Sequence, residues 1–488
     1  MVVGIARYGA YLPKYVLPRG KIAEAWDFPS IPGGIAVSNA DEDSLTMAVE
    51  AGLDCLGDSD PKLVDALFFA STTPPYTEKA SSSIVAAALD LRDDVDAMDV
   101  ADSTRASTIA FRRAREAIAS GAAKRVLVVA ADSRVPMPES MYEYTHGDGA
   151  AAVLLSDEDV AVTVVGAKSI TDVTSGPWKR ATDKWVRQFE IKHENVYGFA
   201  GNVARAVGAL VKEHGVDPKK VKKVALAAPD PRSAMAVAKR LGFKERAVQD
   251  SLFMSVGHLG NAHALMLLIL ALRRGRPGDQ VVFAGYGDGA DAFLLEVADK
   301  ERLLAARSAC RGVSGYLNAQ VQLEKYASYL AKKEKLETDR FTRKSSPVRV
   351  WRDRKILAPL YGMRCTACGV VQYPIWRACI ECGAKDQREL VKLAKTGVVF
   401  TYTLDHLVGG SYFVTPVPRC VVDLDGGGRI LLDMTDCDPH DVKIGMRVEL
   451  TYRKVHEGAN FVNYYWKCRP PREPEGSGPE AEGPGGSD

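Results

Sequence analysis

The sequence predicts an α/β body made of two similar halves, followed by a cysteine-rich ribbon and a small all-β barrel. The segment GDGAAAVLL at 147–155 has a counterpart in GDGADAFLL at 287–295. Each copy lies downstream of an apolar strand pattern, at 126–130 and 281–285, and each strand pattern follows a helix pattern. A strand–helix–strand–hairpin unit that occurs twice is expected to bury two apolar sheets against shared central helices. The functional site of such a body is expected where the halves meet.

Length, charge and apolar runs limit the class of protein. A chain of 488 residues is too long for a single core. Its formal net charge of +2 gives no reason to expect nucleic acid or an anionic membrane as the main partner. The longest apolar run, at 264–272, is too short to span a bilayer. No secretory signal pattern opens the sequence, so we expect a cytoplasmic protein.

Changes in composition divide the chain into six expected parts. A charged, helix-prone segment follows the body, and a basic polar stretch then leads to the cysteines. Beyond them, short alternating patterns with Gly and Pro turns predict a closed barrel of the OB type. The final residues have almost no apolar content and are expected to be disordered. The expected parts are two halves at 1–165 and 166–300, a helical connector and extended linker at 301–354, a ribbon at 355–390, an OB-type barrel at 391–470 and a tail at 471–488.

Four of the nine cysteines form two CxxC pairs. Each CxxC turn aims two thiolates at one point, and the Gly after each pair suits the left-handed backbone that such turns need. Two turns make a closed site with four sulfur ligands and no open position for substrate or water. The sequence therefore predicts a structural zinc rather than a catalytic one. The predicted ligands are Cys365, Cys368, Cys379 and Cys382.

Polar residues at two strand-to-helix turns are the candidates for catalysis. In the first half, Asp102, Ser103 and Thr104 precede a helix pattern. Residues of these types also cap helices, which contributes about 1 kcal/mol and is compatible with a catalytic role. In the second half, His258 and Asn261 precede the equivalent helix pattern and could supply a base and an oxyanion donor. The alternative is that His258 only hydrogen-bonds to the main chain and that His263 lies on the core face of the helix.

Longer segments resemble the hydroxymethylglutaryl-CoA synthase and ketoacyl synthase III branch of the thiolase superfamily. The resemblance covers about 1–298 and includes the opening GIARYGAYLPKYVLPRGKIAEAW, STTPPYTEKASSSIVAAALDL at 71–91, both GDGA hairpins and GNAHALMLLILAL at 260–272. About 320–470 resembles the ribbon-plus-OB module that accompanies thiolases and acyl-CoA synthases as a separate subunit. The resemblance implies a duplicated five-layered thiolase-like fold and a coenzyme A thioester as substrate. It also implies a homodimer formed through the first-half sheet, and a thiolase or acyl-CoA synthase as a further partner.

The resemblance also reveals departures at the expected catalytic positions. Enzymes of this branch use a cysteine five residues after an aspartate like Asp99, and this position holds Thr104, beside Ser103. A hydroxyl needs a strong neighbouring base before it can attack a thioester. The family's histidine falls near Pro229 and its glutamate near Thr72, so both are absent at the matching positions.

One family group is retained, and two assignments of it stay open. Asn261 matches the asparagine of the family's GN motif. Alternatively, Gly257 and His258 resemble the GH motif of other members of the superfamily, which would make His258 the base.

Three hypotheses for function follow. The first is an enzyme that forms or cleaves a carbon–carbon bond beta to an acyl-CoA thioester without a cysteine intermediate, since an oxyanion site and one acid/base suffice for that step. The second is an acyltransferase with Ser103 or Thr104 as nucleophile. The third is a non-catalytic acyl-CoA-binding or scaffolding subunit that pairs with a cysteine-bearing thiolase. A cavity filled by side chains would favour the third hypothesis, and an open one would favour the first two.

Overall fold

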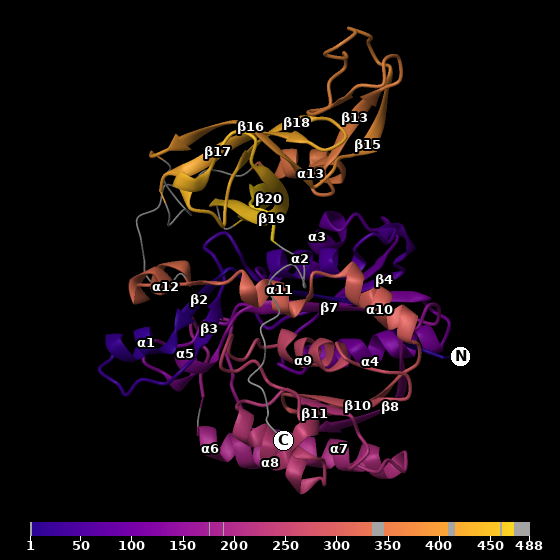
Figure 1. Ribbon diagram of the computed structural model, residues 1–488, viewed down its shortest axis with the longest axis vertical. Helices are drawn as coiled ribbons and strands as arrows, with labels where there is room; N and C mark the ends of the chain where they lie inside the picture. The colour runs from indigo at the N-terminus through magenta and orange to yellow at the C-terminus, as the bar shows by residue number, and fades with distance from the viewer. Residues whose placement is uncertain are drawn as a thin grey trace, which may run out of the picture.

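The computed structural model describes residues 2–174, 176–188, 190–333, 346–407, 415–458 and 461–472. Its α/β body has five layers, in which helices cover both outer faces and two further helices fill the centre (Figure 1). The ribbon and barrel lie together at one end of the body. Within the described residues, no helix is both long enough and apolar enough to cross a membrane.

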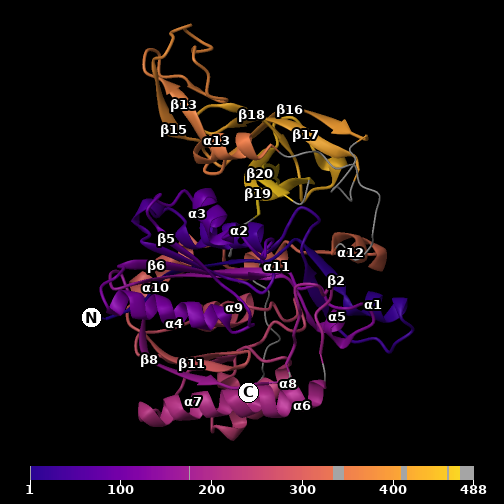
Figure 2. The same cartoon turned by 180° about the vertical axis from the view of Figure 1, so that it is seen from behind.

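The first half of the body contains five strands. Its elements are β1 (Gly4–Tyr11), α2 (Ser44–Leu56), β4 (Ala66–Ala70), α3 (Ser81–Ala88), β5 (Asp96–Val100), α4 (Ala106–Ala119), β6 (Arg125–Asp132) and β7 (Gly149–Ser156). The strand order is β5-β4-β6-β7-β1. Helices α2 and α3 cover the outer face, and α4 lies on the inner face (Figure 2).

The second half repeats this arrangement with four strands. Its elements are β8 (Val162–Thr171), α6 (Ile191–His193), the π-helix η2 (Glu194–Ala200), α7 (Gly201–Glu213), β9 (Lys223–Leu226), α8 (Pro231–Arg240), α9 (Ala262–Leu272), β10 (Gln280–Tyr286) and β11 (Gly289–Val297). Helices α7 and α8 cover the outer face, and α9 packs beside α4 in the centre. Because sheets lie on both sides of it, α9 is apolar all round and almost completely buried.

The two predicted sheets are joined into one sheet of nine strands. Strand β1 pairs with β7 along its length, while Gly4 and Ile5 also pair with Thr163 and Val162 of β8. This pairing completes the order β5-β4-β6-β7-β1-β8-β11-β10-β9. The sheet therefore folds around α4 and α9, and the halves share one interior.

Smaller elements surround the body. These are β2 (Tyr15–Pro18), α1 (Arg19–Ala25), β3 (Gly34–Val37), α5 (Met141–Thr145), α10 (Lys300–Ala309), α11 (Gly312–Asn318), β12 (Val321–Gln322), α12 (Tyr326–Lys332) and α13 (Pro347–Leu357). The predicted amphipathic helix at 321–330 differs in its first residues, because Val321 and Leu323 donate to main-chain carbonyls beside and within β2. Most of the predicted linker lies at 334–345, outside the described residues.

The ribbon and barrel form two small sheets. The ribbon consists of β13 (Tyr361–Cys365), β14 (Val371–Gln372) and β15 (Arg388–Lys392), and the barrel of β16 (Thr396–Asp405), β17 (Val417–Leu424), β18 (Arg429–Asp433), β19 (Arg447–Gly458) and β20 (Phe461–Arg469). The barrel strands have the order β18-β17-β16-β19-β20. A bridge between Met434 and Cys468 brings the two outer strands together, as expected for a closed OB-type barrel.

A buried network of ion pairs joins the barrel to α2 and the segment before it. Arg453 of β19 contacts Asp41 at 3.1 Å, Glu42 at 2.9 Å and Asp436 at 2.7 Å, and its side chain is fully buried. Burial alone would raise the pKa of Asp41, but Lys467 and Arg453 lower it below its usual value. Further members of the network are Glu50, Glu449, Arg469 and Arg472. Arg472 falls within the tail predicted to be disordered, yet it is buried because it pairs with Asp436.

Candidate functional site

A cavity of about 720 Å³ opens where the two halves meet. Its lining comes from the ends of β4 and β5, from the segment between β8 and η2, and from the turn between β10 and β11. This is the place at which the duplicated body was predicted to hold its functional site. Its lining includes Thr72, Tyr76, Lys79, Asp102, Ser103, Thr104, Arg134, Trp178, Lys179, Glu194, Tyr286 and Asp288.

The three candidates of the first turn all line this cavity. Asp102 is exposed and has a φ of 75°, a left-handed conformation that is uncommon outside glycine. The Thr104 hydroxyl donates to the carbonyl oxygen of Tyr286 at 2.8 Å, and Ser103 Oγ accepts from the Arg105 N–H at 3.3 Å. Within the described residues, neither hydroxyl is hydrogen-bonded to a carboxylate, an imidazole or an amine. Neither hydroxyl therefore has the base that a nucleophile would need.

Glycine at 287 is what allows the first turn to approach the second half. A Cβ atom at Gly287 would lie 2.4 Å from Ser103 Oγ and 2.7 Å from Thr104 Oγ1. Any larger residue would push the two hydroxyls away from Tyr286 and out of their present positions in the cavity wall.

Asn261 stabilises the contact between the halves. Its main-chain N–H and its side-chain amide both donate to Asp132 Oδ2, at 2.7 and 3.1 Å, and its Oδ1 accepts from the Ser107 N–H at 3.1 Å. Asn261 therefore caps the first turn of α4 from the opposite half, a role the sequence assigned to residues 102–104. Its polar atoms are used by the protein, and the lining of the cavity does not include it.

His258 is neutral and lies behind the cavity lining rather than in it. Burial, then the neighbouring His263 and Arg134, lower its pKa well below the usual value. Its Nδ1 accepts from the Gly260 N–H at 3.2 Å, so the remaining hydrogen is on Nε2. Its ring stacks on that of His263 with 4.2 Å between centroids. The structure thus separates His258 and Asn261 from Asp102, Ser103 and Thr104.

His263 makes the stability of the fold depend on pH. Burial lowers its pKa to about 3, below the value of about 6.5 for an unfolded histidine. As the pH falls between these values, the unfolded chain binds a proton that the folded chain does not. The free energy of unfolding should therefore decrease by up to about 1.4 kcal/mol per pH unit. We expect His263→Asn to remove this contribution, so that urea unfolding at about pH 7 and about pH 4 differs less than in the unchanged protein. An equal difference in both proteins would contradict the assignment.

Sequence patterns did not identify the wall formed by 174–194. This segment has no helical or strand periodicity, although it is rich in aromatic and basic residues. It contributes Trp178 and Glu194 to the cavity, and Glu194 is only 8% exposed. Arg134, 6% exposed, lies in the same lining, where burial lowers its pKa. Only their common position in the fold brings these residues together.

The four predicted zinc ligands lie at one point at the tip of the ribbon. Their sulfur atoms are all within 4.8 Å of one another. The sulfurs of Cys365 and Cys382 are 3.7 Å apart, and those of Cys368 and Cys379 are 3.6 Å apart. A tetrahedron with Zn–S bonds of about 2.3 Å has edges of about 3.8 Å, so the cluster fits this metal. Four sulfur ligands leave no open position for catalysis.

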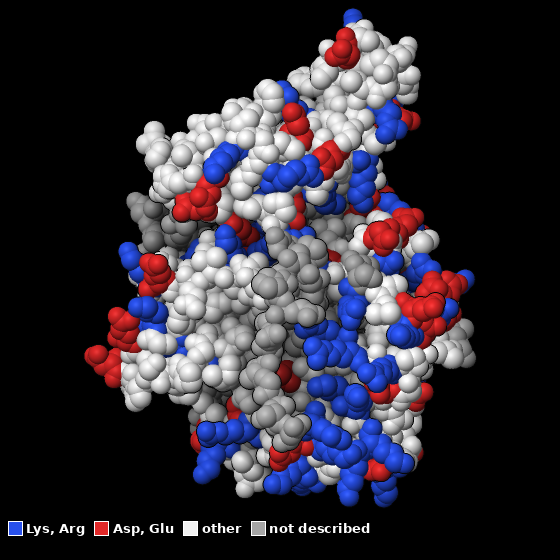
Figure 3. Space-filling model, viewed as in Figure 1, with Lys and Arg blue, Asp and Glu red and all other residues white. Residues whose placement is uncertain are grey.

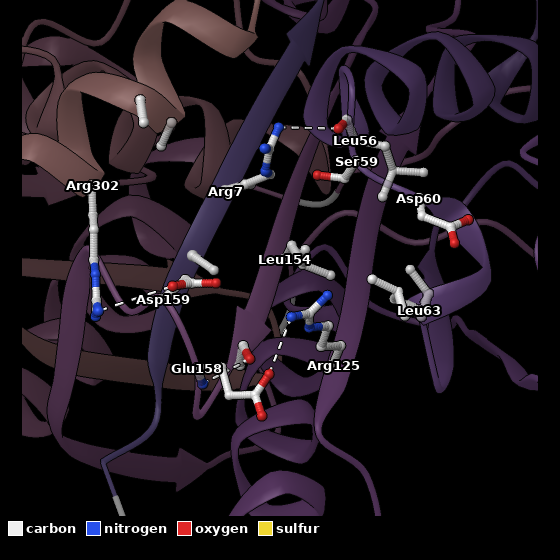
Figure 4. Close-up of a pocket in the computed structure, with 15 residues that line it drawn as sticks. Arg7, Leu56, Ser59, Asp60, Leu63, Arg125, Leu154, Glu158, Asp159 and Arg302 are labelled. Atoms are coloured by element: carbon white, nitrogen blue, oxygen red, sulfur yellow. Dashed lines mark hydrogen bonds and ion pairs between the residues drawn. The ribbon is translucent and has the colours of Figure 1, made fainter.

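Two other features lie on the surface of the body, apart from the cavity between the halves. A cavity of about 260 Å³ beside β1 is lined by three arginines, each paired with a carboxylate. Figure 4 shows two of these pairs, those of Arg125 and Arg302. The pairs are Arg7 with Asp58, Arg125 with Glu158 and Arg302 with Asp159. Lys and Arg side chains also gather over α10 and towards α7 (Figure 3). The cavity also contains Ser59 and Ser156, but its arginines are already paired, and no histidine or cysteine among the described residues lines it.

Family models match this chain in three places. Residues 98–173 match the family model for 3-oxoacyl-[acyl-carrier-protein (ACP)] synthase III. Residues 211–296 match the model for the C-terminal part of the same family, 3-oxoacyl-[acyl-carrier-protein (ACP)] synthase III C terminal. Residues 390–453 match the family model described as "ChsH2, C-terminal OB-fold domain". The first two matches fall one in each half of the body, and the third falls on the barrel.

Relatives and solved structures agree with these matches. The chain is 30% identical over 345 residues to the hydroxymethylglutaryl-CoA synthase of Methanopyrus kandleri, covering 69% of this chain and 98% of that protein. It is 31% identical over 350 residues to that of Aeropyrum pernix, covering 68% of this chain and 94% of that protein. A crystal structure of hydroxymethylglutaryl-CoA synthase with CoA superposes with a TM-score of 0.62 at 15% identity, over 80% of this chain and all of that one.

The class of protein follows from fold and matches together. The body is a thiolase-like fold of the acyl-CoA condensing type, with an OB-fold domain attached, so the predicted fold class is confirmed. Within this class, the chain belongs to the hydroxymethylglutaryl-CoA synthase family.

Proposed function

We propose that this protein forms or cleaves a carbon–carbon bond beta to the thioester of an acyl-CoA, without an acyl–cysteine intermediate. The main support is the cavity, which remains open at about 720 Å³ and polar although the residue at the nucleophile position is Thr104. In the condensing chemistry of the family, a thioester enolate adds to a carbonyl carbon. An acyl group that stays on CoA can supply that enolate directly, so an attacking thiolate is not required for the bond itself.

The cavity lining also supports an acyl-CoA as substrate. Thr72, Ser103 and Thr104 line its interior together with the aromatic rings of Tyr76 and Trp178. We assign the Ser103 hydroxyl to hydrogen bonding with the thioester rather than to attack on it, because no base contacts it. The Thr104 hydroxyl already donates its hydrogen to the carbonyl oxygen of Tyr286. Asp102 lies exposed beside them in the lining. In this proposal, Asn261 positions the turn through its bond to Ser107, and neither His258 nor Asn261 touches the substrate.

Basic residues around the cavity are the proposed partners of the phosphates of CoA. Lys79 and Lys179 both belong to its lining and are exposed. Arg105, by contrast, is buried and paired with Asp291, so it does not offer its charge to a ligand. Exposed lysines suit a mobile diphosphate, because their charge needs no fixed geometry.

The alternative function is a non-catalytic acyl-CoA-binding or scaffolding subunit. It is favoured by the joint absence of the family's cysteine, histidine and glutamate. It would also suit the attached ribbon and barrel, which we propose as a contact for a thiolase or acyl-CoA synthase. The open cavity disfavours a subunit that serves only as a scaffold, since such a subunit has no need to keep buried polar groups around an empty space.

We also propose that the protein is a homodimer formed through the first-half sheet. Strand β5 lies at the edge of that sheet, where β4 is its sole neighbour within the described residues. An uncovered edge strand presents unpaired N–H and C=O groups that a second copy can satisfy. The residues of β5 are partly exposed, as an interface strand requires before assembly.

Intact mass measurement after incubation with a panel of acyl-CoA thioesters tests this function. We expect acyl-CoA to be retained in non-denaturing conditions, no covalent adduct after denaturation, and a changed acyl-CoA in the supernatant. The non-denaturing mass should be that of a dimer. A covalent acyl group on Ser103 or Thr104 would instead establish acyl transfer to a hydroxyl. Retained but unchanged acyl-CoA would favour the binding subunit, and a monomeric mass would contradict the dimer.

A further inference from the structure

The carboxylate of Glu194 occupies a space that two glycines leave open. A Cβ atom built on Gly176 would lie 2.7 Å from Glu194 Oε1, and one built on Gly198 would lie 2.5 Å from it. Both distances are shorter than van der Waals contact, so a side chain at either position would displace the carboxylate. Glu194 is 8% exposed and begins the π-helix η2, a form that occurs frequently at functional sites. Burying a carboxylate costs free energy, so a buried carboxylate in the wall of a cavity is a candidate for a functional group.

Tyr286 connects this carboxylate with the first turn. The same Cβ atom on Gly198 would lie 2.2 Å from Tyr286 Oη, so the phenol and the carboxylate share the space over Gly198. The phenol oxygen is buried and makes no hydrogen bond within the described part of the chain. The main-chain carbonyl of Tyr286 accepts the hydroxyl hydrogen of Thr104 at 2.8 Å. One residue thus contacts the turn through its main chain and the Glu194 region through its ring.

From this arrangement we infer that Glu194 transfers the proton at the α-carbon of the acyl-CoA, and that Tyr286 positions its carboxylate. The inference rests on the proposed function and names the group that replaces the family's missing acid/base residues. Glu194, Tyr286, Ser103 and Thr104 line one cavity, so a thioester held by Ser103 shares the same space with the carboxylate of Glu194. The matching position for the family's own glutamate is near Thr72, in the segment between β4 and α3.

The proposed step balances without a co-reactant. In the condensing direction, Glu194 takes a proton from the α-carbon, the C–H electron pair moves into the thioester, and an enolate forms. The enolate carbon attacks the carbonyl carbon of the second substrate, and the resulting alkoxide takes the proton back from Glu194. Cleavage is the reverse: Glu194 takes the β-hydroxyl proton, the carbon–carbon bond breaks, and the proton is returned to the enolate carbon. General acid–base groups contribute about 10²–10⁴-fold to such steps.

Hydrogen–deuterium exchange at the α-carbon isolates this step from the unknown carbonyl partner. Acetyl-CoA and propionyl-CoA are incubated with the full-length protein in D₂O, and deuterium at the α-carbon is followed by mass spectrometry. We expect exchange with the unchanged protein and a loss of about 10²–10⁴-fold in Glu194→Gln, with retention of acyl-CoA and the melting temperature unaltered. The exchange rate of the unchanged protein should rise with pH as the carboxyl group ionises, and this rise should be absent in Glu194→Gln. Glu194→Asp, which keeps the acid, should recover part of the rate.

A matched control and a second variant make the result decisive. Glu213→Gln makes the same chemical change on an exposed, ion-paired residue of α7 and should exchange like the unchanged protein. Tyr286→Phe should lower the rate less than Glu194→Gln and keep the pH dependence. Unaltered exchange in Glu194→Gln would overturn the inference, and so would an unchanged protein that retains acyl-CoA but exchanges nothing. If Glu194→Gln melts early, unaltered exchange in both Glu194→Asp and Tyr286→Phe would overturn it. If the unchanged protein retains no acyl-CoA, the proposed function itself is wrong.

Discussion

Arg453→Met should lower the free energy of unfolding by about 3–5 kcal/mol. The side chain of Arg453 is fully buried and contacts three carboxylates, those of Asp41, Glu42 and Asp436. Methionine fills a similar volume but leaves these carboxylates without their shared cation in an environment that water does not reach. An uncompensated buried charge is costly, whereas the intact pair is close to neutral in its effect on stability. Denaturant unfolding followed by circular dichroism measures the change.

Arg447→Met is the matched control for this prediction. Arg447 lies on the same strand and pairs with Asp425 through two bonds of 2.8 and 2.7 Å, but both side chains are largely exposed. Solvent screens such a pair, so its loss should change stability far less than the loss of Arg453. Equal effects of the two substitutions would mean that burial of the network does not determine its energetic role.

The network also fixes the barrel to the body. Lys467, Arg469 and Arg472 add further buried cations to the same interface. Separating the barrel from the body would break the pairs that cross the interface, which are those with Asp41, Glu42 and Glu50. The barrel therefore belongs to the body as a fixed part, and a mechanism in which it moves to carry acyl groups is disfavoured.

The repeat predicted the body well because its signals are local. A GDGA hairpin after an apolar strand is contained within about 30 residues, so each half could be located from sequence alone. The CxxC pairs are equally local, and their spacing located the four-cysteine cluster. The predicted separation into two sheets was less accurate, because the pairing of Gly4 and Ile5 with β8 joins residues that no local pattern connects.

The candidate site was predicted only in part, for a related reason. Asp102, Ser103 and Thr104 follow a strand directly and were therefore found, whereas Glu194 lies in a segment without periodicity. The polar character of Asn261 was recognised, but its partners Asp132 and Ser107 lie far away in sequence. A residue that caps a distant helix and a residue that faces a cavity have the same appearance in a sequence. Only the three-dimensional arrangement distinguishes them.

Cys379→Ser should abolish zinc binding and unfold the ribbon. Three thiolates hold zinc far less tightly than four, and the apparent binding free energy of a structural zinc, about 10–16 kcal/mol, is largely the folding free energy of so small a unit. The ribbon has three short strands and few apolar contacts of its own, so it has no comparable source of stability. Elemental analysis should find a single zinc per chain in the unchanged protein and none in the variant, and limited proteolysis should cleave the variant within 361–392.

Cys437→Ser provides the control for this second prediction. Cys437 is partly buried in the barrel and lies outside the four-cysteine cluster, so its substitution should leave zinc content and the proteolysis pattern unchanged. A chelator should reproduce the effect of Cys379→Ser, because Cys368 and Cys382 are exposed and give it access to the metal. Since the ribbon projects away from the body beyond the contacts of Tyr361 and Lys392 with Asp90, the exchange of α-hydrogens in the cavity should continue after zinc removal. Loss of that exchange together with the zinc would mean that the ribbon contributes to the site after all.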